Sequence, residues 1–285
     1  LSGNLDLFYE KRNDILTQYL TRPQWVGVAM AAANLGKTKN SGYEIELKHA
    51  NHIGKDFNYT VGLTYSHAKN EILMMDEPDL KTDYRKREGH PINQYFGLVC
   101  DGFITQADID GGKLPVSKLG ENVGVGDLKY RDMNGDGLID ERDETFIGYS
   151  DIPENTYALS LGANYKNWGF SVMFQGVNHV SRYYDAEAIA KYPRLHYDSY
   201  GNHNQRGNSF FLKNGAFMRL KNIELSYTLP TLWAKKVGMS DCRLYVNANN
   251  LITWDDLDDL TDPESNGSNR YPIMKTVNFG VNIKF

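Results

Sequence analysis

The sequence lacks a long apolar run. Its longest nearly apolar stretch covers residues 26 to 33, whereas a membrane-spanning helix needs about 20 apolar residues. A helical membrane protein is therefore excluded. The chain also begins without Met, a basic segment or an apolar segment, so no secretory signal peptide is visible. Because residues 5 to 9 already resemble part of a strand, we expect the signal peptide and further upstream parts to precede this chain.

Positive charge and catalytic motifs are also scarce. The 31 Lys and Arg residues against 36 Asp and Glu give a formal net charge of −5, and the basic residues are scattered, which argues against a nucleic-acid surface. The sequence contains no Gly-x-Ser-x-Gly, no His-Glu-x-x-His and no phosphate-binding loop. We therefore expect no nucleic-acid partner, no catalytic residues and no enzymatic activity.

The C-terminus has a regular alternation of apolar and polar residues. Val277, Phe279, Val281 and Ile283 fall on one face, and small polar residues fall on the other. A period of two marks a β-strand, and this pairing of faces is typical of a strand in a transmembrane barrel. The low mean hydropathy does not contradict a barrel, because the two faces cancel in any window average.

Similar alternation predicts eight strands, an even number as in bacterial barrels. Their ranges are 3–16, 40–52, 55–69, 155–166, 168–178, 215–229, 241–253 and 275–285. The connections alternate between short ones and long ones, the latter at 17–39, 70–154, 179–214 and 254–274. Outer-membrane barrels sort short turns to the periplasm and long loops to the outside. The predicted fold is therefore all-β, a transmembrane antiparallel β-barrel with long extracellular loops and a helical turn within 230–240.

Several different short motifs are spread along the whole chain. Asn40-Ser-Gly42-Tyr-Glu44 enters a predicted strand, and Glu88 to Gly97 with Asp101 to Ile104 form a loop motif. Further motifs follow in order: Gly126-Asp127, Asp132 to Gly137, Ile147-Gly148, Phe217 to Pro230, Arg243 to Val246, Asn250 to Thr253, Asp262-Pro-Glu264 and Tyr271-Pro272. In this order they resemble the C-terminal part of SusC/RagA-type TonB-dependent transporters, the outer-membrane nutrient importers of Bacteroidetes.

The resemblance implies a fold and a function. Residues 1–285 would be the C-terminal portion, about eight strands, of a barrel of about 22 strands, with the plug and the first strands upstream. The whole protein would lie in the outer membrane as a multi-pass barrel and import oligosaccharides or peptides by TonB-dependent uptake. Its partners would be a SusD-like lipoprotein, the TonB-ExbB-ExbD complex reached through the N-terminal part, the cargo and membrane lipid. The resemblance does not identify the substrate-binding residues.

An acidic loop at 132–143, within the long connection 70–154, predicts a metal site. It has oxygen-bearing side chains at positions 1, 3, 5, 9 and 12 of a calcium loop and Gly137 at position 6. The flanks are not amphipathic helices, so a helix-loop-helix sensor is not expected. The prediction is a structural Ca²⁺ that fixes the long loop, and the alternative is a solvated turn without an ion. The predicted ligands are Asp132, Asn134, Asp136, the carbonyl of Leu138, Asp140 and Asp143.

Charged and histidine side chains elsewhere allow more than one interpretation. Glu44, Glu46 and Lys48 either line a substrate path or pair with one another. The acidic run at 255–264 is predicted to be a solvated loop rather than a cation site. The histidines of the connection 179–214 lack metal spacing and are predicted to be scattered loop residues; they are His179, His196 and His203.

The predicted topology also gives expected positions for the tryptophans and cysteines. Trp168, Trp233 and Trp254 fit interfacial aromatic girdles, and Trp25 is a candidate for stacking on a sugar ring. Cys100 and Cys242 are predicted at opposite ends of an apolar band of about 25 Å, beyond the Cα separation of about 7 Å that a disulfide allows. We therefore predict that both cysteines are unpaired.

Two other classes of protein stay open at this stage. The first is a calcium-dependent soluble surface module for glycan binding or adhesion, which would bury the apolar strand faces in its own core. The second is a secreted glycan-degrading enzyme, whose paired carboxylates cannot be recognised from spacing in the sequence.

Overall fold

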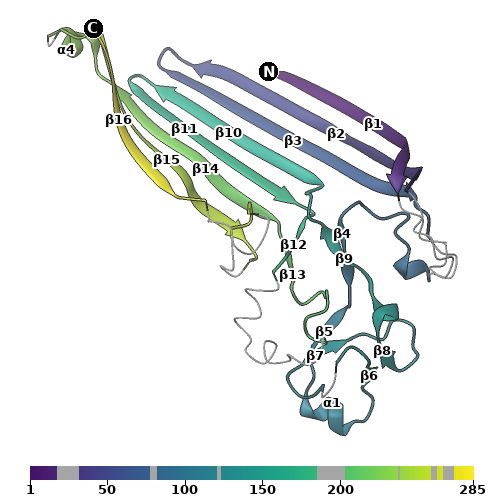
Figure 1. The fold of residues 1–285 in the computed structure, drawn as a ribbon. Helices are drawn as coiled ribbons and strands as arrows, with labels where there is room; N and C mark the ends of the chain where they lie inside the picture. Colours follow the sequence, from purple (N-terminus) through teal and green to yellow (C-terminus); the bar gives the residue numbers. More distant parts are fainter. Residues whose placement is uncertain are drawn as a thin grey trace.

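One large curved sheet dominates the fold, and a separate lobe extends from one of its ends (Figure 1). The computed structural model describes residues 1–17, 32–77, 82–120, 123–184, 203–236, 238–257, 262–265 and 273–285. No helix in these ranges is long and apolar enough to cross a membrane.

The sheet has eight strands in the order β1-β2-β3-β10-β11-β14-β15-β16, and all neighbours are antiparallel. All eight predicted strands are present. β1 and β16 form its edges, so the sheet is not closed. The bounds are β1 Ser2–Thr17, β2 Ala33–Ile53, β3 Phe57–Met74, β10 Asn155–Tyr165, β11 Trp168–Asn178, β14 Phe217–Thr228, β15 Asp241–Asp255 and β16 Thr276–Lys284.

The start of β2 differs from its predicted position. The sequence places it at residue 40, whereas the strand begins at Ala33. Residues 34 to 39 show no apolar alternation, yet they pair with β1 on one side, and from Lys37 onward also with β3 on the other. Pairing with both neighbours therefore extends the strand where local sequence pattern gives no signal.

The register gathers the apolar side chains on one face of the sheet. Leu63, Leu159 and Phe174 are cross-strand neighbours in β3, β10 and β11. No layer covers this face in the described part of the chain, and Phe279 of β16 is 83% exposed. A soluble β-domain packs such a face against a second layer. The soluble module that would bury its strand faces in its own core is therefore not what the structure shows.

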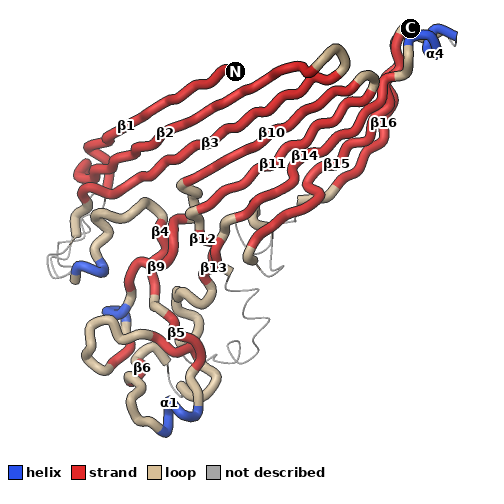
Figure 2. The backbone as a smooth tube through the Cα atoms, turned by 180° about the vertical axis from the view of Figure 1, so that it is seen from behind, coloured by secondary structure: helices blue, strands red, loops and turns tan. Residues whose placement is uncertain are grey.

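The connections are sorted by length to opposite ends of the sheet. The turn end carries residues 54–56, residues 166–167 and the longer connection 229–240, which contains α4 (Thr231–Lys236). Gly54 and Lys166 have positive φ angles of 65° and 52°, as tight hairpin turns require. The predicted helical turn within 230–240 is confirmed. The described parts of the long connections lie at the other end, which we call the lobe end (Figure 2).

The lobe is a folded unit rather than an open loop. Residues 94–150 and 203–214 share a core formed by Leu98, Leu128, Tyr130, Ile139 and Phe211. The elements of the lobe, together with those that border it toward the sheet, are η2 Asp83–Arg85, β4 Gln94–Gly97, β5 Cys100–Phe103, α1 Gln106–Asp110, β6 Val116–Ser117, β7 Leu128–Tyr130, β8 Leu138–Ile139, η3 Glu141–Asp143, β9 Thr145–Ser150, β12 Ser181–Tyr183 and β13 Leu212–Asn214.

Two short ladders join the lobe to the sheet. β4 pairs with β9, between β3 and β10 in the chain, and β12 pairs with β13, between β11 and β14. We call these two ladders the stalks (Figure 2). A β-bridge between Leu98 and Asn208 links the segments that follow β4 and precede β13.

Candidate functional site

The middle of the polar face is lined by small uncharged residues. Ser160 and Gly162 of β10 pair with Gly62 and Thr60 of β3. A Cβ built on Gly62 would lie 2.5 Å from the Ser160 hydroxyl, and one built on Gly162 would lie 2.6 Å from the Thr60 hydroxyl. Each hydroxyl therefore occupies the space that a side chain would need. The result is a flat polar strip across the centre of the sheet.

Charged residues flank this strip on β1 and β2. Lys48 Nζ lies 2.5 Å from Glu46 Oε1, and the Ser66 hydroxyl donates to Glu44 over 3.2 Å. Asp6, Glu44 and Glu46 border a hollow of about 260 Å³ on the polar face. Glu46 and Lys48 are therefore paired, as one of the two interpretations expects, and both Glu44 and Glu46 border the hollow.

Four charged residues fasten the connection between β15 and β16 to the polar face at the lobe end. Arg219 Nη2 donates to both carboxylate oxygens of Asp262 over 2.8 Å, and Nη1 donates to Glu264 over 3.2 Å. Lys221 Nζ donates to both oxygens of Glu264 over 2.9 Å. The Arg219 side chain is only 2% exposed. We call these four residues the charge quartet.

The charge quartet corrects the prediction for the acidic run 255–264. Asp262 and Glu264 are ion-paired rather than solvated, and Asp256 accepts a hydrogen bond from Asn214 over 2.9 Å. Residues 258–261 lie outside the described residues. The partners belong to two of the motifs noted in the sequence, Phe217 to Pro230 and Asp262-Pro-Glu264, and nothing in the sequence shows that they meet.

An apolar hollow of about 330 Å³ lies in the lobe near α1, bordered by residues such as Ile104, Ile109 and Val116. His203 lies against it and is 2% exposed. Its Nε2 lies 2.7 Å from the Leu128 carbonyl oxygen, and its Nδ1 lies 2.8 Å from Ser117 Oγ. Since a carbonyl only accepts, Nε2 carries the proton and Nδ1 accepts from Ser117.

His203 is therefore a buried structural residue: it lies in a turn of a long connection, as predicted for a loop residue, but it is packed inside the lobe. Because the Ser117 and Leu128 contacts satisfy both ring nitrogens, burial of the imidazole carries no hydrogen-bonding penalty. His179 stacks on Tyr149 with ring centroids 4.9 Å apart. His196 lies outside the described residues.

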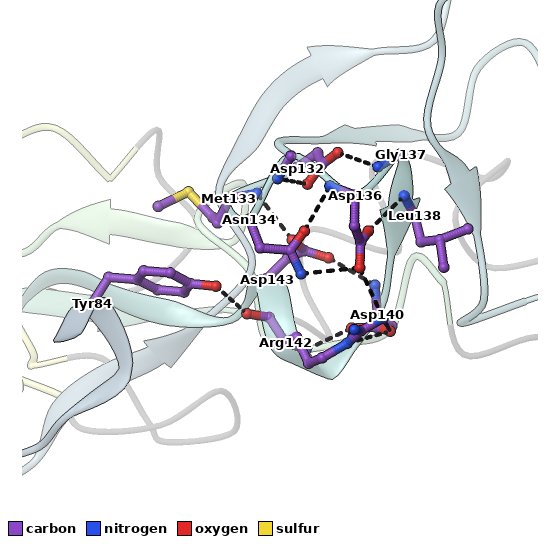
Figure 3. Close-up of polar contacts among 11 residues, drawn as sticks. Tyr84, Asp132, Met133, Asn134, Asp136, Gly137, Leu138, Asp140, Arg142 and Asp143 are labelled. Atoms are coloured by element: carbon purple, nitrogen blue, oxygen red, sulfur yellow. Dashed lines mark hydrogen bonds and ion pairs between the residues drawn. The ribbon is translucent and has the colours of Figure 1, made fainter. Parts of the chain in front are cut away.

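Side chains of the acidic loop accept hydrogen bonds from the loop's own backbone (Figure 3). Asp132 accepts from the N–H groups of Gly135 and Gly137 over 2.6 and 2.8 Å. Asn134 accepts from Asp136 N–H, and Asp136 accepts from Leu138 N–H, each over 2.9 Å. The N–H donors hold the pKa of Asp132 below its usual range, with Gly137 the main cause. These bonds turn the side-chain oxygens toward the inside of the loop.

The other end of the loop closes onto Asp143. Its buried carboxylate accepts from Met133 N–H and from Asp140 N–H, both over 2.9 Å. The carbonyls of Gly137 and Ile139 accept from β6, whereas Leu138 N–H donates to Asp136. The backbone of Leu138 therefore faces the loop interior, as its predicted role as a carbonyl ligand requires.

Arg142 supplies positive charge inside this loop. Its Nη2 lies 2.9 Å from Asp136 Oδ2 and 2.7 Å from Asp140 Oδ2. Arg142 is also the main cause that lowers the pKa of Asp140. Among the described residues, no three His, Cys, Asp or Glu side chains form a group that could hold a metal ion. In this arrangement the guanidinium occupies the inner oxygens of Asp136 and Asp140, so an ion would have to displace it.

The cysteines and tryptophans agree with the predicted topology. Cys100 and Cys242 are both free, which confirms the prediction, and burial raises the pKa of the Cys100 thiol. Trp168 contacts Tyr227 at the turn end, with ring centroids 4.8 Å apart, and Trp254 lies near Phe174 at the lobe end. Trp25 lies outside the described residues.

A curved antiparallel sheet with one uncovered apolar face, one polar face and connections sorted by length is the wall of a transmembrane β-barrel. Residues 1–251 match the model of the family described as "TonB dependent receptor-like, beta-barrel". The chain therefore belongs to the TonB-dependent receptors, a family of transporters and receptors.

Individual relatives refine this assignment. The chain is 28% identical to TonB-dependent receptor P26 of Formosa agariphila, over 99% of this chain and 32% of that protein. It is 23% identical to TonB-dependent receptor SusC of Bacteroides thetaiotaomicron, over 100% of this chain and 30% of that protein. The fold superposes on the RagAB peptide importer in its "open-open" state with a TM-score of 0.72, at 21% identity, over 99% of this chain and 32% of that chain.

The resemblance to SusC/RagA-type transporters is thus confirmed. The chain spans about a third of the length of these relatives.

Proposed function

We propose that this chain forms part of the barrel wall of an outer-membrane importer driven by TonB. The observation that carries the proposal is the uncovered apolar face opposite a polar face, because the strands of a transmembrane barrel present such a face to lipid. The apolar face then contacts lipid and the polar face lines the lumen. The lobe end points outside the cell, the turn end lies in the periplasm, and the connection 70–154 is extracellular.

The proposed cargo is an oligosaccharide or a peptide, captured together with a SusD-like surface lipoprotein. The SusC relative and the RagAB peptide importer support this pairing. Energy reaches the barrel from the TonB-ExbB-ExbD complex through the N-terminal part of the protein. Aromatic and polar groups of the lobe and lumen would contact the cargo, and no covalent step is involved.

The test uses the intact gene product. We expect it to fractionate with outer membranes and to copurify in detergent with a lipoprotein encoded beside it. Copurification that survives a salt wash supports the importer. A soluble product without a lipoprotein would overturn both the membrane location and the partner.

We also propose that the loop 132–143 binds Ca²⁺ and fixes the fold of the lobe. Inward-facing oxygens of Asp132, Asn134 and Asp136 support the proposal, and displacement of Arg142 from Asp136 and Asp140 is its condition. The ligand set would be completed by Leu138, Asp140 and Asp143. An exposed extracellular site of this kind has an affinity on the order of 0.1 to 1 mM.

Substitution of Asp136 separates calcium binding from Arg142 pairing. Asp136→Ala should lower the unfolding temperature of the lobe when calcium is supplied and change it little in chelator. Asp110→Ala, in the exposed helix α1, is the matched control and should have no calcium-dependent effect. An equal loss for Asp136→Ala in calcium and in chelator would mean that Arg142 supplies the only cation of the loop.

A further inference from the structure

The connection 229–240 differs from the two tight turns at the same end of the sheet. The tight turns carry Gly54, Lys55 and Asp56 or Lys166 and Asn167, whereas this connection carries the short helix α4. Leu232 and Trp233 of α4 are 78% and 61% exposed. The helix ends in Lys235 and Lys236, which are also exposed. An apolar tip beside two cations is an unusual surface for a turn in water.

The burial of Cys242 favours a position of α4 on the lipid side of the wall. Cys242 belongs to the apolar face, opposite Ile283, yet it is only 4% exposed, while Leu244, two residues along the same face, is 42% exposed. The connection 229–240 packs at this position, because Leu229 N–H donates to the Cys242 carbonyl over 2.8 Å and α4 contacts β15. Figure 1 shows α4 projecting from the sheet beside the C-terminus.

The charged residues of this segment are all positive. Residues 230 to 240 contain two lysines and no acidic residue, although the whole chain has a formal net charge of −5. Apolar and aromatic side chains beside lysines are the pattern of a segment that lies in the interfacial region of a bilayer. Ala234, by contrast, is buried, so the helix has one side fixed to the barrel and one side free.

We propose that α4 is an interfacial anchor that binds anionic phospholipid of the periplasmic leaflet. Leu232 and Trp233 enter the boundary between headgroups and acyl chains, and Lys235 and Lys236 pair with headgroup phosphates. This inference rests on the proposed function, because it requires the turn end to lie at the periplasmic surface of the outer membrane. The anchor fixes the height and tilt of β14 and β15 in the membrane.

The test places an environment-sensitive fluorophore on Leu232→Cys in the intact transporter, with other cysteines replaced by alanine and the protein in lipid nanodiscs. We expect strong quenching at position 232 by phospholipid that carries a spin label near the headgroup. A label on Lys113→Cys, in the lobe, should not be quenched. A label on Val281→Cys, on the apolar face, reports whether the barrel has inserted at all.

Lipid preference is measured with spin-labelled phosphatidylglycerol against spin-labelled phosphatidylcholine at equal fractions. Anionic lipid should quench position 232 more strongly, and Lys235→Gln with Lys236→Gln should reduce this preference by up to about five-fold per lysine. Lys55→Gln, in a tight turn of the same end, is the matched control and should leave the preference unchanged.

The outcomes separate this inference from the proposed function. If position 281 is quenched but position 232 is not, the barrel is in the membrane and the anchor is wrong. If the fluorophore at position 232 reports an apolar environment only after addition of a periplasmic extract, a protein rather than lipid covers α4. This result also overturns the anchor. Equal quenching by both lipids in every variant would overturn the proposed pairing of Lys235 and Lys236 with anionic headgroups. If neither 232 nor 281 is quenched, the membrane location itself fails.

Discussion

At the level of single residues, the charge quartet holds the connection between β15 and β16 against the polar face of the sheet. Arg219 is almost wholly buried and has both Asp262 and Glu264 as partners, so its removal takes the paired guanidinium from Asp262, while Glu264 keeps Lys221. Breaking a buried ion pair by removing one partner costs far more than removing the whole pair. The individual contacts are therefore coupled and cannot be treated as independent.

Arg219→Met should destabilise the barrel by about 3 kcal/mol, as measured by urea unfolding of the intact protein in detergent. Adding Asp262→Asn to the same chain should recover most of this loss, because Asp262 then carries no unpaired charge and Glu264 stays paired with Lys221. Lys39→Met is the control, since Lys39 and Glu71 form a more exposed pair and such pairs contribute at most about 1 kcal/mol. A loss for Arg219→Met no larger than that of Lys39→Met would show that the quartet does not fix the connection.

Single residues also show where sequence analysis reached its limit. The sequence indicated a turn rich in Asp, Asn and Gly at 132–143, because the contacts of such a turn are local in the chain; its binding of calcium stays a prediction. His203 and the quartet could not be predicted, since their partners lie tens of residues away and no spacing rule connects them. The ion pairs of Arg142 could not be predicted for a different reason: Arg142 lies within the loop sequence but does not occupy a ligand position of the pattern.

The loop 132–143 should respond to acid as one element. The pKa values of Asp132 and Asp140 are both lowered in the folded loop, so the folded state binds fewer protons than the unfolded state. The stability that these groups contribute is present above the unfolded pKa of about 3.9 and is lost as the pH falls through the lower folded pKa values.

Hydrogen exchange of the N–H groups of Gly137 and Arg142, corrected for intrinsic rates, should therefore stay constant from pH 6 to about pH 4.5 and lose protection below about pH 4. The ladder β4–β9, which lacks these carboxylates, is the internal reference. Protection of Gly137 that persists to pH 2.5 would contradict a stabilising role for the Asp132 carboxylate.

Strands were predictable as elements where one face is uniformly apolar, as in β3, β10 and β16. The lobe was not, because its strands are only two to six residues long and too short for a period of two to be recognised. Its core residues, such as Leu98, Leu128 and Phe211, come from segments far apart in the chain. The sequence therefore predicted one long loop where the structure has a folded unit.

At the scale of the whole molecule, the two faces of the sheet allow a direct test of whether one face contacts lipid. Leu63 and Thr64 are adjacent in β3 and point to opposite faces, with Leu63 on the apolar face and Thr64 beside the hollow formed with Glu44 and Glu46. Leu63→Arg should destabilise the barrel by about 2 to 4 kcal/mol if it reaches the bilayer interior. Thr64→Arg should change stability little, because acidic groups lie next to it.

Both variants are measured by unfolding of the intact protein in lipid vesicles. A soluble β-domain predicts a different result, since Leu63→Arg would then disrupt a protein core and remain disruptive in detergent-free buffer. Equal and small effects of the two substitutions would mean that neither face is buried in lipid.

The two stalks determine how the lobe moves relative to the wall. A loop on one flexible hinge swings freely, whereas a body mounted on two separate legs resists both rocking and rotation. Here one leg, β4–β9, leads into β10, and the other, β12–β13, connects β11 with β14, which are neighbours in the sheet. The bridge between Leu98 and Asn208 braces one leg against the other. The lobe is therefore mounted on the wall at two places, within one run of four adjacent strands.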